Sequence, residues 1–205
     1  MNFRKWVNLF MSSAGIGIVV ALIVGVIEML IHPEVKLAEM GTQGIIYNLV
    51  NTAIIGALLG VFSHMGFFAY LTVNYFAQGI FRSKYMWMYV QIFIIIVSTV
   101  YSVALRVPEG ESFLPYTVVP LFVIVGSLPV VFMKVKQTNR KSLIPTLFFM
   151  IAVTLIEAVP ALRQDNGYGT AMMLLPLFIC NAWQILQLHK LVVPSAKEET
   201  AASAS

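Results

Sequence analysis

The stretch of this chain at 44–81 contains no lysine, arginine, aspartate or glutamate. An α-helix rises about 1.5 Å per residue, so about 20 apolar residues cross the roughly 30 Å hydrocarbon core of a bilayer. The stretch is nearly twice that length. It is therefore one long helix, one broken helix or two crossings, and the choice decides on which side of the membrane every later loop lies.

The composition places the chain in a membrane. Of its 205 residues, 59% are hydrophobic and 11% are charged, whereas a soluble domain carries about 25% charged residues. Such a chain has too few polar side chains to cover a water-soluble surface. Its formal charge of +4 is too small and too scattered to indicate nucleic-acid binding. A single cysteine, Cys180, excludes an internal disulfide.

Six apolar segments are predicted to cross the membrane, separated by short polar links. They lie at 7–31, 44–81, 86–105, 116–133, 143–162 and 170–188. We therefore predict an all-α fold, a polytopic six-helix transmembrane bundle over residues 1–191. The length leaves no room for a second domain, and the small, polar tail at 192–205 is expected to be disordered.

The basic residues favour a single crossing at 44–81. With one crossing, ten of the 13 lysines and arginines lie on the side that holds both termini. With two crossings, the basic loop at 134–141 lies opposite Arg4 and Lys5. Because basic residues collect in cytoplasmic loops, we predict six crossings with both termini cytoplasmic. Tilt, or a break at 63–66 that neighbouring helices satisfy, would absorb the surplus length.

Small and polar residues recur every four positions on two of these segments. The row on the second segment is Asn48, Thr52, Gly56, Gly60 and His64, and the row on the first is Gly17, Ala21 and Gly25. Such rows let two helix backbones approach closely. Helix packing is the favoured interpretation. The functional alternative is a polar cavity lined by Asn48, Asn51 and His64.

Glu157 is the one carboxylate well inside an apolar segment. It lies six residues before Arg163, about 9 Å along a helix. Ionisable groups in a membrane are costly and are functional hypotheses by default. One hypothesis gives Glu157 a conformational or recognition role. The other is structural, with Glu157 either protonated or paired with Arg163 or Arg106.

Enzyme signatures are missing from the sequence. It contains no H-E-x-x-H, G-x-S-x-G or G-x-x-x-x-G-K motif. Its three histidines lie on different segments, without the spacing of metal ligands, and no loop is long enough to fold alone. We therefore expect no catalytic activity, no cofactor and no metal site.

Four segments resemble those of a known family. They are MGFFAYLTVNYF (65–76), GESFLPY (110–116), KSLIPTLFFMIAVTLIEAVPALR (141–163) and LFICNAWQILQLHKL (177–191). In order, spacing and length, the chain resembles the KinB-signalling pathway activation family, the KbaA type, of endospore-forming bacteria. The resemblance implies a non-catalytic plasma-membrane protein that a membrane sensor histidine kinase needs to feed the sporulation phosphorelay. It assigns no functional residue and no mechanism.

Transport is the competing function class. The substrate-capturing subunits of vitamin transporters are of similar size and commonly have six helices. They resemble one another in an A-x-x-x-A motif on the first helix, which 7–31 lacks. A ligand bound or moved by this chain, and then sensed by the kinase, therefore stays open beside direct contact with the kinase.

Overall fold

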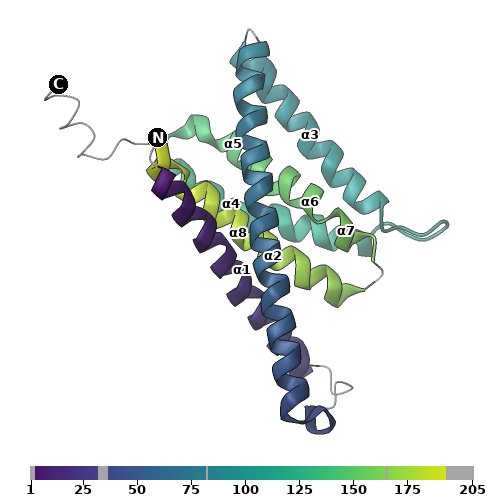
Figure 1. Cartoon of the computed structure of the whole chain (residues 1–205). Helices are drawn as coiled ribbons and strands as arrows, with labels where there is room; N and C mark the ends of the chain where they lie inside the picture. The colour runs from purple at the N-terminus through teal and green to yellow at the C-terminus, as the bar shows by residue number, and fades with distance from the viewer. Residues whose placement is uncertain (1–2, 32–36, 82, 165, 193–205) are drawn as a thin grey trace, which may run out of the picture.

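The computed structural model describes residues 3–31, 37–81, 83–164 and 166–192, and most of them are helical (Figure 1). The predicted tail at 192–205 lies outside the described residues, except for Val192. The predicted all-α class is confirmed for the part of the chain that is described.

Five long helices make up most of the fold. They are α1 (Phe3–Ile31), α2 (Leu37–Ile80), α3 (Lys84–Ala104), α4 (Val118–Gln137) and α8 (Gly167–Val192). Each contains a stretch that is long and apolar enough to cross a membrane. Their lengths and hydropathy indicate a multi-pass membrane protein.

The predicted fifth crossing, 143–162, is not one regular helix. It consists of a 3-10 turn η2 (Arg140–Ser142), α5 (Leu143–Leu147), a π-helical segment η3 (Phe148–Val153), α6 (Thr154–Glu157) and α7 (Val159–Leu162). Proline has no backbone N–H, so Pro160 cannot donate a helical hydrogen bond to the carbonyl of Ile156. This missing bond favours the turn at Ala158 that separates α6 from α7. Where six regular helices were predicted, the described residues form five and this interrupted segment.

α2 is one continuous helix across the uncharged stretch. Its one non-helical residue is Gly41 (φ 60°, ψ 171°), so the break predicted at 63–66 is absent. The stretch from Gly41 to Ile80 has 40 residues, about 60 Å at helical rise and twice the hydrocarbon core. α2 crosses α1 and α8 obliquely, and its last turns and the start of α3 form a hairpin that projects beyond the other helices (Figure 1).

α1 and α2 pack along facing rows of small residues. The buried residues of α1 recur every four positions and are Leu9, Ser13, Gly17, Ala21 and Gly25. A Cβ added to Gly60 of α2 would lie 2.6 Å from the backbone oxygen of Ser13, and one added to Gly56 would lie 2.5 Å from that of Gly17. The methyl group of Thr52 fills the space at Gly25. The two backbones are thus in direct contact along this row.

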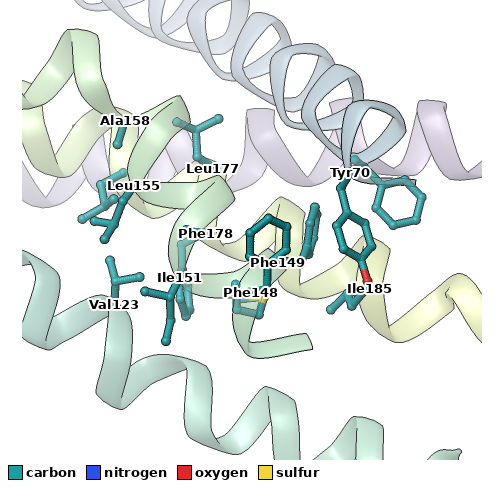
Figure 2. Packing of buried hydrophobic residues seen from close by; sticks show 14 of the residues in the cluster. Tyr70, Val123, Phe148, Phe149, Ile151, Leu155, Ala158, Leu177, Phe178 and Ile185 are labelled. Carbon is teal, nitrogen blue, oxygen red and sulfur yellow. The ribbon is translucent and has the colours of Figure 1, made fainter. Parts of the chain in front are cut away.

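The hydrophobic core lies where the interrupted segment meets α2, α4 and α8 (Figure 2). The ring of Phe149 packs against the rings of Phe67 and Tyr70, with centroids 5.5 and 4.9 Å apart. Val123 of α4 and Leu177 of α8 are fully buried in the same cluster. Irregular backbone at membrane depth is tolerated where protein encloses it, and this core encloses it.

The described ends of the chain lie together at one end of the bundle. Lys5 Nζ, near the start of α1, lies 3.5 Å from the backbone oxygen of Lys190, near the end of α8. Lys134 Nζ, near the end of α4, donates to the backbone oxygen of Ile185 at 2.5 Å. The start of α5 lies at this same end (Figure 1).

The α1–α2 contact makes a prediction about two glycines. Gly60→Ala places a methyl group against the backbone of α1 and should lower the free energy of unfolding by about 1–3 kcal/mol. Gly15→Ala on α1, where an added Cβ meets nothing within 4 Å, should be neutral or stabilising by up to about 1 kcal/mol. Unfolding of both variants in detergent measures the difference. Equal stability of the two variants would contradict the backbone contact.

Candidate functional site

A cluster of polar side chains lies inside the bundle, where α1, α2, α6 and α8 meet. Its members are all buried, and we call them the buried polar cluster: Ser13, Ser63, Thr154, Glu157, Asn181 and Gln184. Hydrogen bonds between membrane helices hold them in register. The cluster therefore joins elements from both ends of the sequence.

Asn181 of α8 is the centre of the cluster. Its Nδ2 donates to Glu157 Oε2 at 2.7 Å and to Thr154 Oγ1 at 3.0 Å. Its Oδ1 accepts from Ser63 Oγ at 2.7 Å. A side-chain amide has two N–H donors, and Asn181 uses both on α6. This one residue thus joins α2, α6 and α8.

Gln184, three residues further along α8, extends the cluster to α1. Its Nε2 donates to Ser13 Oγ and to Ser63 Oγ, both at 2.8 Å. Ser13 Oγ in turn donates to the backbone oxygen of Gly60 at 3.1 Å. Cys180 Sγ donates to the backbone oxygen of Ser13 at 3.3 Å. The tight α1–α2 pair is therefore attached to α8 by polar contacts as well as by packing.

Glu157 reaches from the end of α6 across to α2. A Cβ on Gly66 would overlap Glu157 Oε1, so the carboxyl group occupies the space that this glycine leaves open. Within the described residues, Glu157 forms no ion pair with Arg163 or Arg106; its bond is to Asn181. Arg163 is exposed, and the guanidinium of Arg106 lies over the Tyr116 ring.

Three buried atoms in this region have no hydrogen-bond partner of good geometry among the described residues, although the His64 and Gln184 side chains lie close enough to interact. The three atoms are Glu157 Oε1, Gln184 Oε1 and His64 Nδ1. A buried polar atom without a partner costs about 1–3 kcal/mol, and such atoms are rare in folded proteins. Their concentration around one cluster distinguishes it from ordinary helix packing.

The three residues of the predicted polar cavity do not come together. His64 is buried between the rings of Phe10 and Phe68, at centroid distances of 5.4 and 4.8 Å. Asn48 lies four turns earlier on α2 and accepts from Thr52 of the same helix at 3.5 Å. Asn51 is exposed. Because α2 is a straight continuation between them, these side chains cannot line one cavity.

Sequence reasoning missed five members of the buried polar cluster. They are Ser13, Ser63, Thr154, Asn181 and Gln184. A signal was available, because Asn181 and Gln184 are three residues apart and so share one face of an otherwise apolar helix. Nothing in the sequence alone indicated that this face meets Glu157.

The geometry suits structural coupling between helices. Most polar atoms of the cluster bond to one another, which leaves few for a ligand. No group of three His, Cys, Asp or Glu side chains in the described residues could hold a metal ion. The arrangement links the positions of four helices, so that a shift of one changes the bonding of the others.

Comparison with known proteins places the chain in a family. A family model for KinB-signalling pathway activation in sporulation, KbaA, matches residues 17–191. This chain belongs to the KbaA family. The resemblance read from the sequence is thereby confirmed, and the match includes every member of the buried polar cluster except Ser13.

A curated relative supports the family membership. The KinB-signaling pathway activation protein of Bacillus subtilis (strain 168) is 36% identical over 140 residues, which cover 66% of this chain and 71% of that protein. No solved structure matches the chain. The KbaA family is a signalling family rather than a known enzyme family.

The central place of Asn181 makes a prediction about stability. Asn181→Leu leaves Glu157, Thr154 and Ser63 without this partner. At roughly 0.6 kcal/mol for each of three bonds between membrane helices, the free energy of unfolding should fall by about 2 kcal/mol.

Asn51→Leu is the matched control, because Asn51 is exposed on α2 and its replacement breaks no hydrogen bond of the cluster. Unfolding of both variants in mixed micelles provides the measurement. Loss of the same stability in both variants would show that the cluster contributes nothing specific.

Proposed function

We propose that this chain activates a membrane sensor histidine kinase by direct contact, in the plasma membrane of a spore-forming bacterium. The observation that carries the proposal is the family match over residues 17–191, described as KinB-signalling pathway activation in sporulation. The relative from Bacillus subtilis carries the same description in its name. The kind of kinase, the pathway and the plasma-membrane location are inferred from family membership. Direct contact with the kinase is inferred from the structure.

The proposed topology has six crossings, with the interrupted segment 140–162 as the fifth and both termini in the cytoplasm. Its support is the common location of the two described ends and the start of α5 at one end of the bundle. That end carries the exposed basic residues Lys136, Arg140 and Lys141. Basic residues on one side mark the cytoplasmic side.

The lipid-facing surface of this chain favours activation by direct contact with the kinase. The described links between helices are short, so nothing in them can bind nucleotide or receive a phosphoryl group in a fold of its own. The outer faces of the helices are apolar, and helix–helix contact is the main chemistry available to them. A bound partner shifts the kinase between signalling states if it binds one state more tightly.

The α2–α3 hairpin is the proposed contact region. It projects beyond the other helices (Figure 1), because α2 is about twice as long as the hydrocarbon core is thick. Large side chains on it remain exposed, among them Tyr75, Phe76 and Tyr85. Exposed aromatic residues of this kind anchor many protein interfaces.

Topology is tested by cysteine labelling on intact cells, in a Cys180→Ala background. Single cysteines at Thr42 and Ser112 should react with an impermeant thiol reagent, and one at Asn139 should react only after the membrane is opened. All three positions are exposed, so reactivity reports the side of the membrane. Labelling of Asn139 from outside would overturn the proposed topology.

Contact with the kinase is tested in liposomes that contain only the two purified proteins and no added ligand. The kinase should co-purify with this chain and autophosphorylate faster. Phe76→Ala on the hairpin should weaken both effects at least fivefold, a loss typical of an interface aromatic residue. Phe132→Ala is the matched control, since Phe132 on α4 is similarly exposed, at 71% against 60%.

Two other results would reject parts of this proposal. If the proteins neither associate nor change the kinase rate, contact fails, and a ligand moved or captured by this chain becomes the better explanation. If association occurs but Phe132→Ala weakens it as much as Phe76→Ala does, the hairpin is not the contact region.

A further inference from the structure

A groove lies between α1 and α8, on the surface and away from the buried polar cluster. It encloses about 370 Å³ where α1 begins and α8 ends. Its polar lining comes equally from the two helices: Lys5, Asn8 and Ser12 from α1, and Trp183, Gln187 and Lys190 from α8. Residues three, four or seven positions apart share a helix face, so each helix contributes one stripe.

Side chains of the two stripes face each other at three successive levels along the helices. At the inner end, Trp183 Nε1 donates to Ser12 Oγ at 3.0 Å. In the middle, Asn8 and Gln187 each carry a side-chain amide. At the outer end, Lys5 Nζ lies 3.5 Å from the backbone oxygen of Lys190. Helical rise puts the outer level about 10 Å from the inner one.

We infer that this groove binds an anionic glycerophospholipid, with the phosphate at the lysines and the acyl chains leading toward Trp183. The inference rests on the membrane placement of α1 and α8 and not on contact with a kinase. Each level of the groove offers what one part of that lipid needs. Two ammonium groups suit the phosphate, and the amides of Asn8 and Gln187 can donate to the ester carbonyls of the glycerol backbone.

The charge of the groove favours an anion. Of the eight described residues that line it, two are lysines and none is acidic. Basic pockets between membrane helices on the cytoplasmic side are suited to anionic headgroups, and the groove lies at the proposed cytoplasmic end.

The apolar side of the groove favours a lipid over a soluble anion. Leu9 and Leu191 line it together with the indole ring of Trp183. Beyond Trp183, toward the middle of the bundle, α1 exposes Val19, seven residues after Ser12, and α8 exposes Ile179, four residues before Trp183. Acyl chains that leave the groove in this direction stay in contact with apolar side chains. Trp at the boundary between headgroups and hydrocarbon is common in membrane proteins.

The test compares two lipids with identical acyl chains, phosphatidylglycerol and phosphatidylcholine, added to the full delipidated chain in detergent. Native mass spectrometry counts the bound lipid and gives relative affinities. Phosphatidylglycerol should bind at one site roughly tenfold more tightly, as expected for two lysines near one anionic headgroup. Soluble glycerol phosphate should not compete, because it lacks the acyl chains.

Two double variants separate the groove from general attraction to positive charge. Lys5→Gln/Lys190→Gln should abolish most of the preference for phosphatidylglycerol. Lys136→Gln/Lys141→Gln changes the net charge equally, at exposed positions of the same end of the bundle, and should leave the preference intact. Each variant should keep the elution volume and melting temperature of the parent chain in lipid-free detergent. Asn8→Leu, which changes no charge, should also weaken binding and serves if the lysine variant misfolds.

Three results would overturn the inference. Equal binding of the two lipids would show that the headgroup is not recognised. Equal losses in the two double variants would show diffuse attraction rather than a site. Photocrosslinking from position 187 to a protein partner, with no effect of added phosphatidylglycerol, would assign the groove to that partner.

Discussion

A bilayer offers no hydrogen-bond partner to a polypeptide backbone, and this constraint decides which parts of the chain lie outside and which inside. The regular helices satisfy their own backbones and can face lipid. The segment 143–162 departs from that regularity, with a π-helical stretch at Phe148–Val153 and a turn at Ala158, and irregular backbone is tolerated at membrane depth where protein encloses it. It therefore lies in the core, where Phe149, Met150 and Ala152 are fully buried. The other helices are arranged around that requirement.

The close approach of α1 and α2 has a consequence for function. Glycine rows let two membrane helices cross obliquely with their backbones in contact. Gly60 contacts Ser13 ten residues after α1 begins, whereas α2 continues for twenty residues beyond Gly60 to Ile80, so α2 extends past the start of α1. The α2–α3 hairpin is that extension, which connects a packing feature at Gly56 and Gly60 with the region proposed to meet a kinase.

Much of the fold follows from local sequence pattern, whereas the candidate site does not. Hydropathy locates the five long helices, and four-residue spacing locates the face on which Gly17 and Gly60 meet, because both depend on near neighbours in the chain. Glu157 was recognisable from the sequence, but its surroundings were not. Pairing with Arg163 or Arg106 was one alternative, and within the described residues its bond is to Asn181 instead. The real partner, Asn181, depends on how α6 and α8 are rotated, which no local pattern contains.

The buried polar cluster contributes more to geometry than to stability. Bonds between membrane helices contribute roughly 0.6 kcal/mol each, while each unpaired buried atom costs about 1–3 kcal/mol. The bonds of Asn181 and Gln184 therefore do little more than offset the unpaired atoms Glu157 Oε1 and Gln184 Oε1. A group of contacts whose favourable and unfavourable energies nearly cancel adds little to the free energy of unfolding. Its bonds form in one relative position of α1, α2, α6 and α8, and a shift that breaks a single bond costs roughly 0.6 kcal/mol. Because these favourable and unfavourable energies nearly cancel, a partner that binds the outer surface of the bundle needs only a modest difference in affinity to favour another relative position of the helices.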